Sequence, residues 1–440
     1  MQQIRLIADD LTGALDSSCA FASEREPIVI GLPWRPIPSG PRIAVSTESR
    51  DLTADAAVES VGAMVHKLKL DSSAPAIWFK KVDSVLRGHP VAETQAAFFV
   101  GNFSHCVFAP AFPAMGRTTV GGSQFVVTPG GKPSPVGPDL VEAFHGFGLA
   151  SLVVDFDGLS LNMAAPAVLL VDAADQQTLT SRIAGLSQRL MDRPTLWSGA
   201  GGLAAALGGM PLSAKSPPVR YFIVGTNHPA SIAQVRVLRK LSLVNEHPAN
   251  ESAPEHPSLF APALTSTSAA GTNREIRRSV EAININDPQN TAVVVTGGAT
   301  LSIVLQTVGA VFLECVGEAM AGVPISRVRG GHWEGVTLLS KSGGFGSPQT
   351  FAQLLQLSKI GEICSFVYRT AAVSRRRHAL DSQPCHLCRR VPGSGGSVET
   401  KHLIETFQNC TGRRNCDGRG IFLQPFQPLG AWNGNDRSGP

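Results

Sequence analysis

Short apolar runs that end in Gly, Asp or Ser recur through the first half of the chain, and each is followed by a segment with helical period. Examples are the segments IRLIADD, RIAVSTES, AIWFKKVDS and HCVFAPAF. Such runs predict buried strands, and strands separated by helices of ten or more residues predict parallel βαβ units. In sheets of this kind functional groups gather where the strands end.

A second set of strand-then-loop segments ends in glycine or small polar residues instead of carboxylates: TLWSGAGG, VRYFIVGTNH, TAVVVTGGAT and VTLLSKSGG. Between the two sets, residues 208–218 are rich in Gly, Ser and Pro and read as a linker. We therefore predict an α/β protein with two α/β domains, residues 1–210 and 219–358.

Regular apolar periodicity is lost after residue 358, so residues 359–440 are predicted to form an irregular, poorly ordered tail. The tail contains Cys385-x-x-Cys388, which is half of a zinc site, but the later pair Cys410 and Cys416 is off the usual spacing. A solvated basic tail is favoured over a zinc site or a nucleic-acid contact, because aromatic residues are sparse among its arginines.

Composition narrows the class of protein. The 440 residues are 43% hydrophobic, which suffices for sizeable cores, and the net charge of +4 gives no strong footprint for nucleic acid or a membrane surface. Asp9 and Asp10 interrupt the stretch where a signal peptide would need an apolar run, and no stretch of about 18 apolar residues exists. We expect a soluble cytoplasmic protein with buried, reduced Cys19, Cys106 and Cys315.

Two charged segments follow predicted strands and are candidates for a site. The pair Asp9 and Asp10 leaves the first strand, and because adjacent carboxylates repel, a cation or polyol is expected beside them. The alternative is a helix N-cap at Asp10 or Thr12. The segment KKVDSVLRG supplies both cations and a carboxylate, as binding of a small hydroxylated acid would require; the alternative is a surface ion pair between Asp83 and Arg87.

Glycine-rich loops form a further group of candidates. Arg117 lies beside glycines in PAFPAMGRTTVGG, which suits a further binding loop or a plain turn. The loops TGGAT and SKSGGFG present consecutive backbone N–H groups that suit phosphate oxygens, and VGTNHPAS is a third loop of small residues.

The sequence lacks one common nucleotide-binding motif and matches part of another. A Walker A motif is absent, since Val336 stands where its lysine should be. Gly199, Gly201 and Ala204 fit G-x-G-x-x-A and admit an NAD site, but the next strand lacks the acidic residue that would bind a ribose. An NAD-dependent hydroxy-acid oxidoreductase is therefore the alternative function.

Six segments resemble, in order, those of the four-carbon acid sugar kinase family: IADDLTGALD, KKVDSVLRGHP, PAFPAMGRTT, VGTNHPASIAQ, VTGGAT and LSKSGGFGSP. The resemblance implies an acid-sugar-binding domain at 1–210 and a nucleotide-binding domain at 219–358, with their mainly parallel sheets facing each other across a cleft in which the reaction takes place. It also implies transfer of phosphate from ATP with Mg²⁺ to the terminal hydroxyl of threonate, erythronate or a 3-oxo-tetronate.

The candidate residues divide between the two domains. On the acid-sugar side we expect Asp9, Asp10, Lys81, Asp83, Ser84, Arg87 and Arg117. On the ATP side we expect Thr226, Gly297, Gly298, Ala299, Thr300, Gly343 and Gly344. Asp83 or Asp10 is the expected base, with Arg87 as a third catalytic candidate, and the residues that would hold a metal are left open.

The chain departs from the family at two places. It has Gly225-Thr226-Asn227-His228 where members commonly have G-S-x-S, and Ala299 where they have the glutamate of G-G-E-T. A catalytically impaired sugar-acid-binding protein is thus another alternative. The tail matches nothing in the family. Its bias toward Arg, Cys, Gly and Pro resembles that of a segment translated in a shifted reading frame. A small-molecule acid is the expected partner, and a homodimer is one assembly that the chain could form.

Overall fold

The computed structural model of the protein describes residues 2–70, 75–127, 131–154, 167–246, 256–262 and 268–357. The predicted tail, residues 359–440, and its cysteines lie outside the described residues. No helix in the described part of the chain is both long and apolar enough to cross a bilayer.

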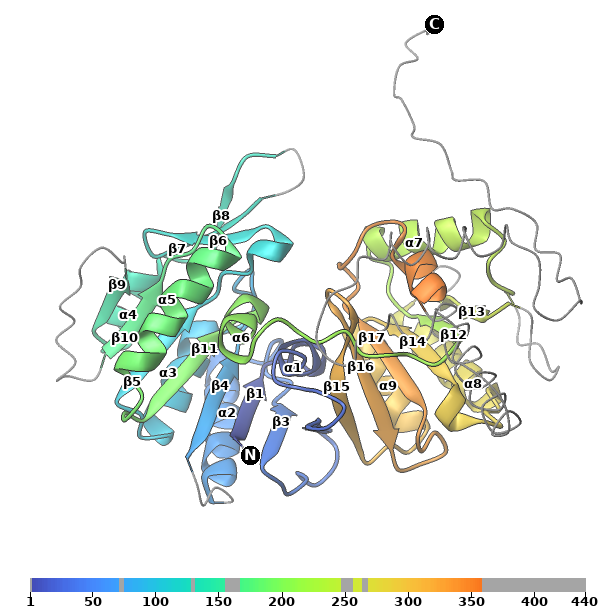
Figure 1. Ribbon diagram of the computed structural model, residues 1–440, viewed down its shortest axis with the longest axis horizontal. Coiled ribbons are helices and arrows are strands. Elements are labelled where there is room, and N and C mark those ends of the chain that lie inside the picture. The colour runs from blue at the N-terminus through green and yellow to red at the C-terminus, as the bar shows by residue number, and fades with distance from the viewer. Residues whose placement is uncertain are drawn as a thin grey trace, which may run out of the picture. The chain divides into compact units, whose positions relative to one another are not determined.

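Eight strands lie parallel to one another in one part of a large sheet (Figure 1), and we call them the first set. In sheet order they are β2 (Ile28–Gly31), β3 (Arg42–Ser46), β1 (Gln3–Ala8), β4 (Ala76–Lys81), β11 (Thr195–Gly199), β5 (His105–Ala109), β10 (Ala167–Val171) and β9 (Ser151–Val154). They include β11, the TLWSGAGG segment that the sequence pattern groups with the second set; that grouping is wrong, because this strand pairs with β4 and β5. β1, β3 and β5 are buried along almost their whole length, as their apolar sequences predict.

The strands of the second set continue the same sheet. Four are parallel, namely β13 (Ser258–Phe260), β12 (Val219–Val224), β14 (Ala292–Thr296) and β17 (Thr337–Lys341). An antiparallel hairpin of β15 (Phe312–Met320) and β16 (Val323–Arg329) follows β17 in the sheet order, and β15 pairs with β2. The hairpin therefore joins the two sets edge to edge.

Helices connect the strands as the βαβ pattern predicts. They are α1 (Leu11–Ser18), α2 (Ala54–Leu70), α3 (Pro90–Val100), α4 (Leu140–Gly146), α5 (Gln176–Arg189), α6 (Gly201–Gly208), α7 (Pro229–Lys240), α8 (Ala269–Ala282) and α9 (Gly298–Thr307), with short 3-10 turns η1 (Pro113–Met115) and η3 (Pro288–Asn290). Residues 350–357 are also helical. The predicted α/β class with a mainly parallel sheet is confirmed, but the sequence did not predict that both sets share one sheet.

A second, smaller sheet lies outside this pattern. It is antiparallel and consists of β6 (Arg117–Val120), β7 (Ser123–Val126) and β8 (Ser134–Val136). The predicted linker, residues 208–218, holds no strand or helix beyond the last residue of α6 and is tied to β15 through backbone hydrogen bonds between Leu212, Ala214 and Glu318.

α1 is the element that positions the site. Its apolar residues Leu11, Ala14 and Leu15 are buried, and the helix contacts β1 and β3 of the first set and α9 and β17 of the second. Polar side chains on α1 can therefore reach groups from both sets.

Candidate active site

The sheet register brings three polar segments together. Ala8, at the end of β1, is paired with Ser46 of β3 on one side and with Lys81 of β4 on the other. The chains that leave these parallel strands therefore start from one edge of the sheet, and Asp9, Asp10 and the loops that follow β3 and β4 meet there.

Arg50, in the loop after β3, binds both carboxylates that follow β1. Its Nε donates to Asp9 Oδ2 at 2.7 Å, and its two terminal nitrogens donate to the oxygens of Asp10 at 2.6 and 2.9 Å. It also lies 3.7 Å from Asp83 Oδ2. This guanidinium is the cation that the repulsion between neighbouring aspartates calls for, and sequence reasoning did not identify it.

Asp10 has a second role as the N-cap of α1. Its Oδ1 accepts a hydrogen bond from the backbone N–H of Gly13 at 2.8 Å, and its Oδ2 accepts one from the Thr12 hydroxyl at 2.7 Å. A Cβ atom at Gly13 would lie 3.1 Å from Lys81 Nζ, so the glycine gives Lys81 room beside the helix. The N-cap and the site were alternatives at the sequence level, and Asp10 takes part in both.

Asp83 is held by the loop that follows β4. Its Oδ1 accepts from the backbone N–H groups of Val85 and Arg87, and its Oδ2 accepts from Nε and a terminal nitrogen of Arg87 at 3.1 and 2.6 Å. The predicted ion pair with Arg87 therefore exists. The Asp83 side chain is only 7% exposed and that of Arg87 is 64% exposed, so the pair runs from the interior to solvent.

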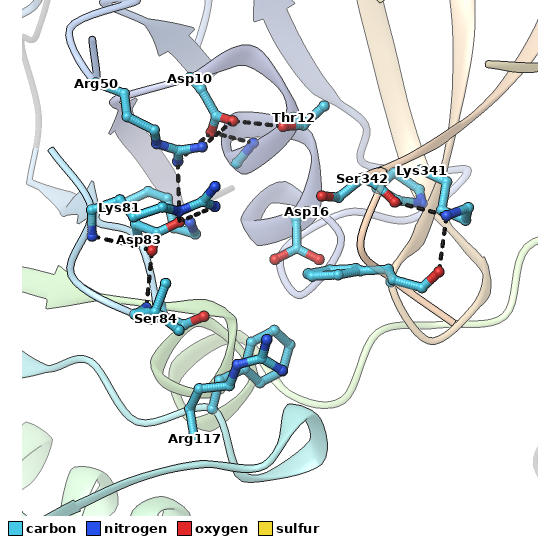
Figure 2. Close-up of a pocket in the computed structure, with 18 of the residues that line it drawn as sticks. Asp10, Thr12, Asp16, Arg50, Lys81, Asp83, Ser84, Arg117, Lys341 and Ser342 are labelled. Carbon is cyan, nitrogen blue, oxygen red and sulfur yellow. Dashed lines mark hydrogen bonds and ion pairs between the residues drawn. The ribbon is translucent and has the colours of Figure 1, made fainter. Parts of the chain in front are cut away.

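A cavity of about 80 Å³ opens beside these groups, and we call it the charged cavity. It is lined from the first set of elements by Asp10, Thr12, Gly13, Asp16, Arg50, Lys81, Asp83, Ser84, Val85, Arg87, Phe112, Arg117 and Ala200. It is lined from the second set by Gly322, Pro324, Ser340, Lys341, Ser342 and Phe345. Figure 2 shows how the labelled side chains surround it.

Three charged side chains that line this cavity have donor or acceptor atoms without a partner among the described residues. Lys81 is 6% exposed, and its ammonium makes no hydrogen bond or ion pair within the described ranges. Arg117 donates one terminal nitrogen to the Met115 carbonyl, but its buried Nε has no partner there. The Asp16 carboxylate likewise has no hydrogen bond or ion pair among the described residues. A buried charge without a partner is costly, so a ligand that complements these groups would be stabilised.

The pKa values divide the aspartates into two kinds. Burial alone would raise the pKa of Asp83, but the hydrogen bonds from Arg87 and the charge of Arg50 outweigh it and hold the pKa at about 2. The pKa of Asp9 is also lowered. Burial would raise it, but the positive charges of Lys81 and Arg50 outweigh the effect of burial. For Asp16 burial dominates and raises the pKa to about 6, against the opposing charge of Lys81.

Lys341 ends β17 and faces the charged cavity from the second set of elements. It is 1% exposed, and its Nζ donates to the carbonyls of Ser342 and Phe345 at 2.7 and 2.9 Å. Burial lowers its pKa to about 8. Lys341 thus fixes the SKSGGFG loop and adds a positive group near its start.

A larger cavity of about 520 Å³ adjoins the first, and we call it the adjoining cavity. Gly298 and Ala299, at the start of α9, line it together with Ser342. Asp10, Thr12, Arg50, Arg87 and Ser342 line both cavities. A ligand that fills the adjoining cavity would therefore reach the edge of the charged cavity.

The three predicted glycine loops meet, because β12, β14 and β17 are adjacent parallel strands. A Cβ atom at Gly343 would lie 2.9 Å from Thr226 Oγ1, and one at Gly297 would lie 3.3 Å from Thr226 Cβ. Gly297 also has a φ of 103°, which favours glycine. These close approaches explain why glycine occupies these positions, and Gly298 and Ala299 at the start of α9 line the adjoining cavity.

The structure places the candidates in three groups. Asp10, Lys81, Asp83, Ser84, Arg87 and Arg117 line the charged cavity, and Asp9, Asp10, Arg87, Gly298 and Ala299 line the adjoining one. Thr226, Gly297, Thr300, Gly343 and Gly344 line neither and support the loops. No group of three or more His, Cys, Asp or Glu side chains in the described ranges is arranged to hold a metal ion.

The glycines that suggested an NAD site are explained by packing. Gly199 ends β11 against the Ala109 carbonyl, and a Cβ atom at Gly201 would lie 2.8 Å from the ring of Phe112. The next strand, β12, lies in the other part of the sheet and not beside β11. The βαβ unit that a dinucleotide fold requires is therefore missing at this position.

Two family models match the chain. A sugar-binding N-terminal domain matches residues 4–207, and a nucleotide-binding C-terminal domain matches residues 267–351. The chain belongs to the four-carbon acid sugar kinase family. The charged cavity is thus lined by residues of the family's sugar-binding domain and by Lys341 and Ser342 of its nucleotide-binding domain.

Members of the family with curated names include a D-threonate kinase of Bordetella bronchiseptica, which is 28% identical in an alignment 403 positions long that covers 80% of this chain and 96% of that protein. A D-erythronate kinase of Heliobacterium modesticaldum is 33% identical over 29% of this chain and 30% of its own length. Among solved structures, a DUF1537-family protein of Haemophilus influenzae has the same fold, with a TM-score of 0.58 at 20% identity over 81% of this chain and 99% of that one.

Proposed function

We propose that the protein is an ATP-dependent kinase that phosphorylates the terminal hydroxyl of a four-carbon acid sugar. One observation supports this most directly. The same small cavity is lined by Lys81, whose ammonium has no partner in the described ranges, by Arg117, which gives one terminal nitrogen to the Met115 carbonyl, and by the buried Lys341 of the nucleotide-binding domain. A small anion bound by the first two would lie next to the phosphate-binding loops.

The sugar acid would bind with its carboxylate toward Lys81 and Arg117. Arg50 and Arg87 are already paired with aspartates, so most of their donors are in use, whereas the Lys81 ammonium has no hydrogen bond or ion pair within the described ranges and Arg117 uses one terminal nitrogen on the Met115 carbonyl. Charge-assisted hydrogen bonds of this kind contribute about 1.5–3 kcal/mol each. The Ser84 hydroxyl and the outer donors of Arg87 would contact the hydroxyl groups of the sugar.

The nucleotide would occupy the adjoining cavity. The start of α9, with Gly298 and Ala299, offers backbone N–H groups and the positive end of a helix to the phosphates. Ser342 lines both cavities, and Lys341, which lines the charged cavity, would lie near the transferred group. Mg²⁺ bound to the phosphates would neutralise their charge, as magnesium binds chiefly through substrate phosphates and water in such enzymes.

A coupled assay of ADP release tests this function. We expect turnover with D-threonate, D-erythronate or a 3-oxo-tetronate, and none with threitol or erythritol, which have the hydroxyl groups but lack the carboxylate. Absence of ADP release with every four-carbon acid, or equal turnover with the uncharged polyols, would contradict the proposal.

A second candidate function is a sugar-acid-binding protein with impaired transfer. It is favoured by Ala299, which is exposed at the adjoining cavity where the family has a carboxyl group. Calorimetric binding of a tetronate together with absent ADP release, in the presence of Mg²⁺ and ATP, would support this function over the kinase.

The cytoplasmic location and the homodimer stay predictions of the sequence. So do the domain limits 1–210 and 219–358, since the large sheet runs through both segments.

A further inference from the structure

The two aspartates expected to act as the base are saturated with hydrogen bonds. Both oxygens of Asp10 accept from Arg50, and they also accept from Thr12 and Gly13. Both oxygens of Asp83 accept from Arg87, with a further bond from Val85. Taking up a proton would break some of these contacts, so both carboxylates are already engaged by the protein.

Asp16 is the carboxylate of the charged cavity that is free of such contacts in the described part of the chain. It lies one helical turn after Thr12 on α1, so both side chains are on the same face. A Cβ atom at Gly201 would lie 3.0 Å from Asp16 Oδ2, so this glycine leaves room for the carboxylate. In Figure 2 the Asp16 carboxylate lies between Lys341 on one side and Arg50 with Asp10 and Asp83 on the other.

We propose that Asp16 is the proton acceptor for the hydroxyl that is phosphorylated, a role that rests on the proposed kinase function. The substrate carboxylate at Lys81 and Arg117 would direct the far end of a four-carbon chain toward Lys341, and Asp16 lines the cavity between these groups.

The proposed step is balanced in atoms and charge. Asp16 takes the proton of the terminal hydroxyl while a lone pair of that oxygen forms the bond to the γ-phosphorus of ATP. The bond from this phosphorus to the bridging oxygen breaks, and its electron pair leaves with ADP. Asp16 then releases the proton to solvent, and the products are ADP and a phosphate monoester.

The electrostatics of Asp16 agree with its geometry. Its raised pKa, about 6, is that of a group that is ionised at neutral pH and still basic enough to accept a proton. The charged or titratable groups around it are Asp10 and Cys19, which cap the two ends of α1, Lys81 on β4, Glu318 on β15 and Lys341 on β17, together with the arginines of the cavity. α6, which packs on α1, has no titratable side chain.

The experiment compares Asp16→Asn with Glu318→Gln. Glu318 also has a raised pKa and interacts with Asp16, but it does not line the charged cavity. For each protein we would measure kcat and KM for a tetronate and for ATP between pH 5 and 8, and tetronate binding by calorimetry.

We expect Asp16→Asn to lower kcat roughly 100-fold or more, since general bases contribute about 10²–10⁴-fold, with tetronate binding retained. The wild-type kcat should fall below pH ~6, and this acidic limb should persist in Glu318→Gln and vanish in the residual activity of Asp16→Asn.

Four outcomes would overturn the proposal. Asp16→Asn with more than a third of the wild-type kcat would exclude Asp16 as the base while leaving the kinase function in place, and so would an acidic limb that survives in this variant. Loss of tetronate binding in Asp16→Asn would make Asp16 a binding residue. A wild-type protein inactive on every tetronate would overturn both this proposal and the function on which it rests.

Discussion

Arg50 and Asp10 form a two-point contact in which the terminal nitrogens of the guanidinium donate to both carboxylate oxygens, at 2.6 and 2.9 Å. The third nitrogen of the same side chain binds Asp9. One planar cation therefore holds two adjacent carboxylates in place at the end of β1, where a lysine would offer a single point of charge.

Arg50→Ala should lower the free energy of unfolding by about 3–5 kcal/mol, because it leaves the buried Asp9 carboxylate unpaired. Urea denaturation measures the change. The matched control is Arg239→Ala, which removes a pair with Glu246 whose side chains are both more than 40% exposed and should cost about 0–1 kcal/mol. Equal losses in the two variants would show that Arg50 does not hold the site together.

Arg117→Met and Lys81→Met should each raise the KM for the tetronate by about 10- to 100-fold, because one charge-assisted contact with the substrate carboxylate is lost. The KM for ATP should change little. Lys132→Met is the control, since Lys132 is exposed and lines neither cavity. Steady-state kinetics measure both KM values. An unchanged KM for the tetronate in both cavity variants would show that Arg117 and Lys81 do not bind the substrate carboxylate.

Asp16→Asn should increase the free energy of unfolding at pH 7.5 by about 1–3 kcal/mol. Burial raises the pKa of Asp16 to about 6, so above that pH ionisation favours the unfolded chain, where the group has its ordinary pKa near 4. Below pH ~4 the carboxyl is protonated in both states and the difference should vanish. Urea titrations at pH 7.5 and pH 4 check this, and a variant less stable than wild type at pH 7.5 would contradict it.

Asp83→Asn should act in the opposite direction. The folded pKa of Asp83 lies at about 2, so its carboxylate contributes stability that is present above pH ~4 and is lost as the pH falls through that value toward 2. The variant should therefore be less stable than wild type by about 2 kcal/mol at pH 7, and the gap should narrow at pH 3. Thermal unfolding at pH 7 and pH 3 checks this. A difference in stability between variant and wild type that is the same at both pH values would show that the ion pair with Arg87 is not its cause.

Ala299→Glu should lower the KM for ATP with Mg²⁺ about tenfold, since it supplies a carboxyl group at the start of α9, in the adjoining cavity. Ala299→Gln provides the matched control of the same size without charge. If both variants had the wild-type KM, the missing carboxyl would have no bearing on nucleotide use.

The sequence located the aspartates of the site because they directly follow β1 and β4, and functional groups gather at the ends of parallel strands. Arg50 follows β3 by four residues in a loop of polar side chains, and only the neighbouring positions of β3 and β1 in the sheet bring it to Asp10. Because the order of strands in the sheet brings Arg50 to the site, no local sequence pattern marks it as a site residue.

Asp16 and Lys341 lay inside segments that the sequence already marked, yet neither was selected. The spacing of Thr12 and Asp16 on α1 was a usable signal, because residues four apart share a helix face. Lys341 was overlooked beside the glycines of its loop, although a lysine at the end of a buried strand is uncommon. The pairing of β15 with β2 joins segments far apart in the chain, which no local pattern predicts.

Phosphorus NMR of the product made from D-threonate and ATP tests most directly that the charged cavity presents the terminal hydroxyl to the nucleotide. A phosphate monoester whose signal is split into a triplet by the two protons of the terminal carbon is the predicted result. A doublet, from phosphate on an inner carbon, or no new monoester signal would contradict it.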